Sequence, residues 1–181
     1  MRNVIVSTYA TLDGRVDDLP EWTIPYNHDA AAAYHDHLLK GADGLLLGRR
    51  TYEIFAAIWP PRAGELPYID KINAMAKYVA STGRPDLQWT NSHLISGGIA
   101  QGVAELKRQP GRDLVVYGGH SLIGRLREDD LIDEYRILVH PVLLGKGPTL
   151  AGDGTKRVDL TLVDTTVLAD SVVVLTYRPA R

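Results

Sequence analysis

Short apolar runs recur along the chain, separated by amphipathic stretches and turn residues. Eight apolar runs, several rich in β-branched residues, predict β-strands; they cover residues 4–9, 43–48, 77–80, 93–95, 114–117, 135–139, 158–167 and 171–177. Stretches with the spacing of one helical face predict helices over residues 29–40, 49–58, 69–74, 99–110 and 120–126. Asn27 or His28 is expected to cap the first helix, and the stretch 15–25, with Pro20 and Pro25, predicts a loop.

Strands that alternate with helices predict an α/β domain with a mostly parallel sheet. The last two runs are joined by a short link at Asp170 and predict a hairpin that adds an antiparallel edge. The chain shows no repeat, low-complexity segment or composition shift, so residues 1–181 are expected to form one domain.

Three segments follow directly after predicted strands and are expected to share one rim of the sheet. Ligands of such sheets bind outside the carboxyl ends of the strands. The segments combine glycines, cations and hydroxyls: Gly48 to Tyr52, Ser81 with Thr82, and Gly118 to Ile123. Arginine and hydroxyl groups suit phosphate oxygens, and a helix that begins at glycines exposes N–H groups to an anion. The rim therefore predicts a ligand with several phosphates, such as a dinucleotide, and its cations favour NADPH over NADH.

The overall composition excludes several other classes. A formal net charge of −2 gives no reason to expect a nucleic-acid partner. The absence of cysteine excludes disulfides and thiolate metal sites, and the histidine spacing predicts no metal site. No apolar run approaches the roughly 20 residues of a membrane span, and the start lacks a signal-peptide pattern, so a cytoplasmic protein is expected. The GxGxxG fingerprint of standard dinucleotide folds and the GxSxG elbow of hydrolases are both missing.

Three motifs together resemble the dihydrofolate reductase superfamily: Gly48-Arg49-Arg50-Thr51-Tyr52, Val79-Ala80-Ser81-Thr82 and Tyr117-Gly118-Gly119. The chain is more similar still to the branch typified by the reductase domain of bacterial riboflavin biosynthesis. Residues 11–14, 131–136, 139–147 and 175–179 carry that similarity, in the same order and over nearly the whole length. The resemblance implies a three-layer dihydrofolate reductase-like fold and an NADPH-dependent reductase.

The resemblance also implies roles for the rim residues. Gly48, Arg49, Arg50 and Thr51 would hold the adenosine phosphates, and Ser81 and Thr82 would face the 2′-phosphate. The first strand and its loop, near Thr8, Tyr9 and Val16, would flank the nicotinamide. The pyrophosphate would lie on the glycine turn and helix start formed by Gly118, Gly119, His120, Ser121, Leu122 and Ile123.

The residues that handle the substrate and the proton are less distinct. Dihydrofolate reductases keep a carboxylate on the first helix, where this chain has Asn27 and, two residues later, Asp29. Asp29 is the catalytic candidate, with a first-turn charge favoured by the helix dipole as the alternative. Trp22 and Tyr52 are substrate candidates because a flat heterocycle stacks on such rings, although both also suit a core. Asp13 is a third substrate candidate, or a turn residue.

The leading hypothesis is an NADPH-dependent reductase of a small pyrimidine- or pterin-like heterocycle, similar to the reductase that acts on 5-amino-6-ribosylaminouracil phosphate. One alternative is a nucleotide-binding module of the same fold without catalysis. Others are a dihydrofolate reductase proper, which the missing carboxylate disfavours, and a different pyridine-nucleotide or flavin oxidoreductase. By analogy with the riboflavin-type branch, a homodimer is expected.

Overall fold

The computed structural model describes residues 1–16, 19–26, 29–152, 156–169 and 171–180. Its strands are β1 (Val4–Thr11), β2 (Ala42–Gly48), β3 (Ala76–Ala80), β4 (Ser92–Leu94), β5 (Asp113–Tyr117), β6 (Glu134–His140), β7 (Leu160–Leu168) and β8 (Val172–Pro179). Its helices are α1 (Leu19–Thr23), α2 (Asp29–Lys40), α3 (Arg49–Ile58), α4 (Pro67–Ala74), α5 (Ile99–Arg108) and α6 (His120–Glu128), with short 3-10 turns at Ile24–Tyr26 and Pro60–Arg62.

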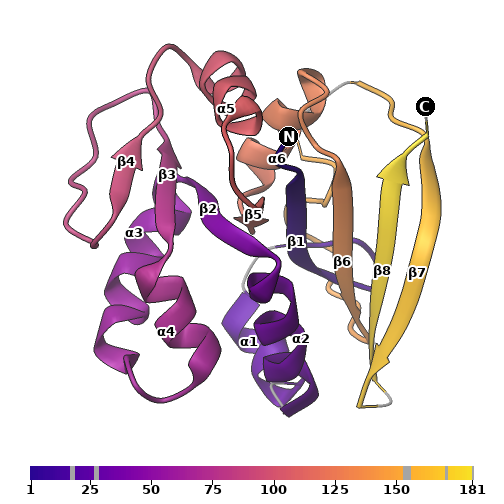
Figure 1. Cartoon of the computed structure of the whole chain (residues 1–181). Helices are drawn as coiled ribbons and strands as arrows, with labels where there is room; N and C mark the ends of the chain where they lie inside the picture. The colour runs from indigo at the N-terminus through magenta and orange to yellow at the C-terminus, as the bar shows by residue number, and fades with distance from the viewer. Residues whose placement is uncertain (17–18, 27–28, 153–155, 170, 181) are drawn as a thin grey trace.

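All eight described strands form one sheet in the order β4-β3-β2-β5-β1-β6-β8-β7. The strands from β4 to β6 run parallel, whereas β8 pairs antiparallel with β6, and β7 antiparallel with β8. This arrangement confirms the predicted α/β fold, with a mostly parallel sheet that ends in an antiparallel hairpin. Figure 1 shows that hairpin standing at one edge of the molecule, with β7 outermost.

Two apolar cores lie on opposite faces of the sheet. One core packs α5 and α6 against the strands through side chains such as Val103 and Leu126. The other packs α2 and α4 against the opposite face, with Leu39 and Ile72 fully or almost fully buried. Because the central strands are covered on both faces, runs such as Leu45–Leu47 are continuously apolar rather than alternating.

One local prediction is wrong. The stretch 15–25 was expected to be a loop, but it contains α1 and a 3-10 turn. Pro20 is compatible with α1 because it falls in the first turn, where the proline's missing N–H would have no intrahelical partner. The predicted cap at Asn27 or His28 and the link at Asp170 lie outside the described residues.

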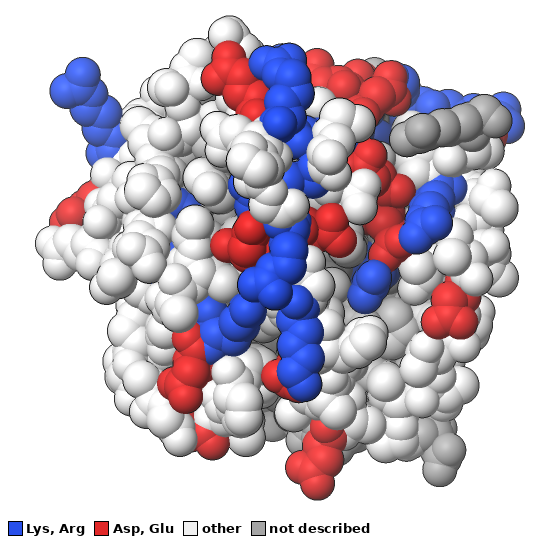
Figure 2. Space-filling model, in the orientation of Figure 1, with Lys and Arg blue, Asp and Glu red and all other residues white. Residues whose placement is uncertain are grey.

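Basic and acidic side chains are interspersed on the surface. On the face shown in Figure 2, Lys and Arg side chains form a narrow band that acidic side chains border on both sides. Exposed charges elsewhere also form ion pairs, including Lys40 with Asp36 and Arg62 with Glu65.

Candidate active site

The three predicted cofactor segments begin at the same edge of the sheet. Gly48, the last residue of β2, lies opposite Ala80, the last residue of β3. Tyr117 ends β5 and lies opposite Ser7 of β1. Because these strands are parallel, the residues that follow them leave the sheet at its carboxyl edge, where ligands of α/β proteins bind.

The starts of α3 and α6 lie side by side at this edge. Gly118 and Gly119 have φ angles of 56° and 76°, in the left-handed region that favours glycine. A Cβ added at Gly119 would lie 3.4 Å from the Oγ1 of Thr51, and one at Gly48 would lie 3.8 Å from the Cβ of Leu122. Both distances are ordinary contacts, so the two helix starts are adjacent, and the positive φ at position 119 is what favours glycine there.

A small cavity lies at the start of α6. Its volume is about 30 Å³, and six of the residues predicted to contact the cofactor line it together with Leu150. The full set is Thr8, Val16, Gly118, Gly119, His120, Ile123 and Leu150. The loop that carries Leu150 passes close to the helix start, since a Cβ at Gly152 would lie 3.0 Å from the carbonyl oxygen of His120. The sequence analysis did not single out Leu150, which lies in the long loop after the predicted strand 135–139 and carries no charged or polar group.

The other rim residues face solvent to different degrees. Arg49, Arg50, Thr82 and Ser121 are exposed. Ser81 is half-buried, and its hydroxyl accepts a hydrogen bond from the backbone N–H of Gly83 at 3.1 Å. Arg49 forms a long ion pair with Glu53, with 3.9 Å between Nε and a carboxylate oxygen. An anionic ligand can approach the exposed cations and hydroxyls from solvent.

The predicted substrate role of Tyr52 is wrong. Its side chain is only 1% exposed and belongs to the core beneath α3. Its hydroxyl accepts a hydrogen bond from the backbone N–H of Trp89 at 3.1 Å. A ring enclosed in this way cannot stack on a ligand.

The remaining substrate and catalytic candidates lie apart from the glycine turn. Asp13 joins two loops, since its carboxylate accepts hydrogen bonds from the Thr11 hydroxyl at 2.6 Å and from the Gly145 N–H at 2.8 Å. These bonds lower the pKa of Asp13 to about 2. Trp22 is buried and packs edge-on against the His140 ring, with centroids 5.1 Å apart. Asp29 is exposed at the first residue of α2.

A polar network that the sequence analysis missed lies beneath this edge of the sheet. The Tyr9 hydroxyl is 2.6 Å from Nε2 of His35, and the Tyr117 hydroxyl is 3.1 Å from Nδ1 of the same ring. Burial lowers the pKa of His35 to about 4 and raises the pKa of both tyrosines above the ordinary phenol value. The imidazole is therefore neutral at physiological pH.

Aromatic rings surround the network. Tyr68 of α4 lies 6.0 Å from the His35 ring between centroids, and Tyr34 lies 5.1 Å from it. The Tyr117 ring lies 6.2 Å from Phe55, and Trp59 packs edge-on against both Phe55 and Tyr68. The cluster offers flat apolar surfaces next to hydroxyl and N–H groups, which is a suitable lining for a heterocycle.

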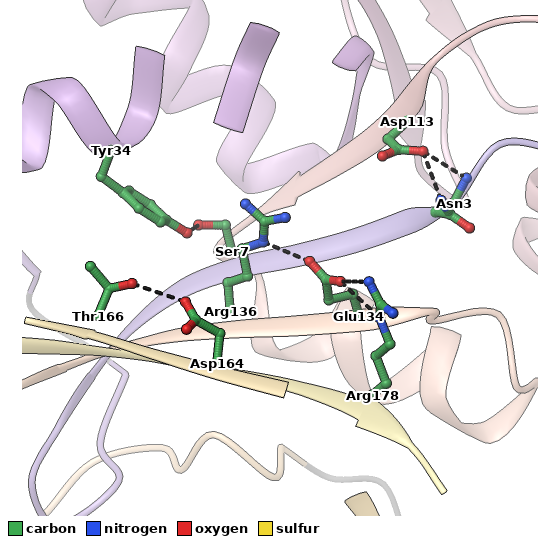
Figure 3. Close-up of polar contacts among 9 residues, drawn as sticks. All are labelled: Asn3, Ser7, Tyr34, Asp113, Glu134, Arg136, Asp164, Thr166 and Arg178. Atoms are coloured by element: carbon green, nitrogen blue, oxygen red, sulfur yellow. Dashed lines mark hydrogen bonds and ion pairs between the residues drawn. The ribbon is translucent and has the colours of Figure 1, made fainter. Parts of the chain in front are cut away.

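A larger hollow lies elsewhere in the described part of the chain. It measures about 520 Å³ and lies between α2 and the strands β6, β8 and β7. Figure 3 shows Glu134 there between Arg136 and Arg178, at 2.7 and 2.9 Å. Because these charges satisfy one another and the hollow borders antiparallel strands, we assign the active site to the carboxyl edge of the parallel strands.

The described residues contain neither a candidate metal site nor a helix that could span a membrane. No group of three or more His, Cys, Asp or Glu residues in this part of the chain is placed to hold a metal ion. None of the described helices is long and apolar enough to cross a bilayer.

The sheet order, the glycine turn after β5 and the adjacent start of α3 define a dihydrofolate reductase-like α/β protein. The model of the RibD C-terminal domain family matches residues 2–174. The chain belongs to this family. A Bacillus subtilis relative, the uncharacterized protein YyaP, is 30% identical over 185 residues, which cover 98% of this chain and 95% of YyaP.

Solved structures share the fold. A putative riboflavin biosynthesis protein from Shewanella sp. PV-4 has a TM-score of 0.77 at 24% identity, covering 99% of each chain. A Thermotoga maritima diaminohydroxyphosphoribosylaminopyrimidine deaminase/5-amino-6-(5-phosphoribosylamino)uracil reductase has a TM-score of 0.72 at 15% identity, over 99% of this chain and 57% of that one. Enterococcus faecalis dihydrofolate reductase, complexed with NADP(H), has a TM-score of 0.67 at 15% identity, over 99% and 97% of the two chains. The fold and the family indicate a riboflavin-pathway reductase-like protein.

Proposed function

We propose that the protein is an NADPH-dependent reductase of a small pyrimidine- or pterin-like heterocycle and acts as one domain over residues 1–181. The observation that carries this proposal is the meeting of the glycine turn after β5 with the start of α3 beside a cavity that Thr8 also lines. Members of the same fold include an NADP(H)-bound reductase and a uracil reductase.

The chain's own groups fit such a cofactor. Gly118 leaves open space where a Cβ would otherwise project, so a ligand can approach the backbone there. The N–H groups at the start of α6 and the exposed Arg49 and Arg50 favour phosphate oxygens. When bound, NADPH would supply a hydride to a C=N or C=O carbon. The aromatic cluster beneath the rim would orient the substrate and exclude water.

The cofactor part of the proposal is tested by fluorescence titration of the full chain with NADPH and NADH. We expect saturable binding that is tighter for NADPH. Arg49→Ala and Ser81→Ala should weaken NADPH more than NADH, because the 2′-phosphate is the group that distinguishes the two cofactors. Equal losses for both cofactors would remove this assignment, and no saturable NADPH binding would refute the reductase proposal.

The substrate part is tested by loss of reduced-nicotinamide absorbance with 5-amino-6-(5-phosphoribosylamino)uracil and with dihydrofolate. Turnover of the uracil compound would support the riboflavin-type activity. Turnover of dihydrofolate alone would favour a dihydrofolate reductase. NADPH binding without turnover of either compound would favour the nucleotide-binding module.

We also propose that the protein is a homodimer in the cytoplasm. Four of its exposed apolar side chains lie on the edge strand β7, namely Leu160, Leu162, Val163 and Val167. A long edge strand with apolar side chains invites pairing with another surface. A second copy that covered β7 and the adjoining hollow would remove these side chains from water.

A further inference from the structure

The Tyr9–His35–Tyr117 network contains one more proton than its own hydrogen bonds use. A neutral imidazole carries one N–H, and each tyrosine carries one O–H, which makes three donors. The two hydrogen bonds of the network use two of them. One tyrosine O–H therefore points away from His35 and is available to another acceptor.

The two distances indicate which tyrosine carries the free O–H. O–H donors make shorter hydrogen bonds than N–H donors do. The short contact of 2.6 Å between the Tyr9 hydroxyl and Nε2 fits an O–H that donates to the ring nitrogen. The longer contact of 3.1 Å fits an Nδ1–H that donates to the Tyr117 oxygen. The Tyr117 O–H is then the free donor, and no acceptor for it lies among the described residues.

The network and the small cavity lie on opposite faces of the sheet at the same carboxyl edge. Tyr117, the last residue of β5, belongs to the core that α2 and α4 cover, whereas Gly118 after it lines the cavity beside α6. Tyr9 packs against α2, whereas Thr8 before it lines the cavity from β1. A substrate beside the network and a cofactor at the cavity would therefore meet at the ends of β1 and β5.

A second donor without a partner borders the same cluster. Nε1 of Trp59 is buried and has no hydrogen-bond partner among the described residues. The Trp59 ring contacts Tyr68, which in turn contacts His35. Buried polar atoms without partners are uncommon in native proteins and call for an explanation. A ligand carbonyl between these rings would satisfy this N–H.

No carboxylate is hydrogen-bonded to the network within the described part of the chain. The titratable and charged groups that face it are Tyr34 on α2, Tyr68 on α4, and Arg136 and His140 on β6. The network is therefore a neutral proton source, unlike the helix carboxylate of dihydrofolate reductases.

We propose that Tyr117 donates the proton that accompanies hydride transfer and that His35 and Tyr9 resupply it; this rests on the reductase function proposed above. The π bond of the substrate's C=N or C=O group breaks as its carbon gains the hydride and its heteroatom gains the Tyr117 proton. Tyr117 then takes the Nδ1 proton of His35, and Nε2 takes the proton of Tyr9. Tyr9, whose hydroxyl is turned toward His35, then regains a proton that comes ultimately from water. The imidazole ends neutral, with its proton moved to the other nitrogen.

The test compares Tyr117→Phe, Tyr9→Phe and His35→Gln with the matched control Tyr78→Phe. The control removes a hydroxyl from β3, where the Tyr78 ring packs against the core on the α5 and α6 face and not against the network. NADPH binding, kcat and KM are measured for each protein with 5-amino-6-(5-phosphoribosylamino)uracil and dihydrofolate. Nitrogen NMR of the His35 ring, which requires no turnover, reports its tautomer and its titration.

We expect Tyr117→Phe to lower kcat about 100-fold or more, the usual scale of general acid catalysis, with NADPH affinity kept within about threefold. His35→Gln and Tyr9→Phe should lower kcat and change its pH profile, whereas Tyr78→Phe should alter kcat less than about threefold. In the NMR spectrum, His35 should stay neutral down to about pH 4, with the proton on Nδ1.

Three results would overturn the proposal: an unchanged kcat in Tyr117→Phe, an equal fall of kcat in the control, or a His35 ring protonated on Nε2. If the wild-type protein fails to bind NADPH or to turn over either compound, the reductase function itself fails, and that result precedes any variant.

Discussion

At the scale of single residues, His35 makes the fold sensitive to acid. Its pKa of about 4 in the folded chain is below the ordinary value near 6.5 because of burial. Between these values the unfolded chain binds more protons, so stability should be complete above about pH 6.5 and fall as the pH drops toward 4. The loss attributable to His35 should reach at most about 3 kcal/mol.

Urea unfolding curves at several pH values check this expectation. His35→Gln should lower stability at neutral pH and flatten the decline between pH 6.5 and 4. His37→Gln, which alters an exposed histidine on the same helix, should leave the pH dependence unchanged. A decline of the same steepness in His35→Gln would show that other groups cause the acid sensitivity.

Gly119 gives a second prediction at the residue scale. A substitution there should affect stability through the φ angle and NADPH binding through the position of the turn, and a control glycine separates the two effects. Gly119→Ala should cost about 1 kcal/mol of stability because alanine disfavours a φ of 76°. It should also weaken NADPH binding about tenfold or more, because a turn shifted away from this φ would no longer present its N–H groups to a phosphate. Gly64→Ala is the matched control, with a φ of 87° in an exposed turn and open space around its Cβ. Thermal unfolding measures the stability of both variants, and NADPH titration measures their cofactor affinity. Equal NADPH affinities would contradict the assigned role of the turn.

At the scale of elements, an enclosed ion pair joins α5 to the start of β6. Nζ of Lys107 lies 2.5 Å from a carboxylate oxygen of Asp133, which also accepts the backbone N–H of Val4 at 2.8 Å. Lys107→Met would leave this largely buried carboxylate without its cation and should cost about 2–3 kcal/mol in urea unfolding. The exposed pair of Arg157 and Asp159 provides the control, and Arg157→Ala should change stability by less than about 0.5 kcal/mol. A loss below about 1 kcal/mol in Lys107→Met would mean that the pair contributes little to holding α5.

The elements themselves could largely be predicted because each depends on local pattern. Apolar runs such as 114–117 are strands, and the glycine turn after β5 starts a helix as expected. The family resemblance and strand order also predicted which segments share the rim. The orientation of a ring on a helix could not be predicted, so Tyr52 was taken for a site residue although α3 turns it into the core. The Tyr9–His35–Tyr117 network was missed because its members come from three elements, and only the positions of Tyr9 and Tyr117 at strand ends offered a signal.

At the scale of the whole molecule, the uncovered edge of the sheet predicts self-association. A standard interface buries about 800 Å² per partner. The total accessible surface is 9670 Å², so such an interface would take under a tenth of it. Leu162 and Val167 are 52% and 58% exposed on β7, and a second copy would cover them at the least cost in polar desolvation.

Light scattering coupled to gel filtration should therefore give the mass of two chains for the wild type. Leu162→Lys and Val167→Lys should give the mass of one, because a lysine at each position would bury a charge. Ile54→Lys, at an exposed apolar position on α3, should remain dimeric. A wild type that has the mass of one chain at micromolar concentration would refute the homodimer, and a dimer that survives both β7 substitutions would move the interface to another surface.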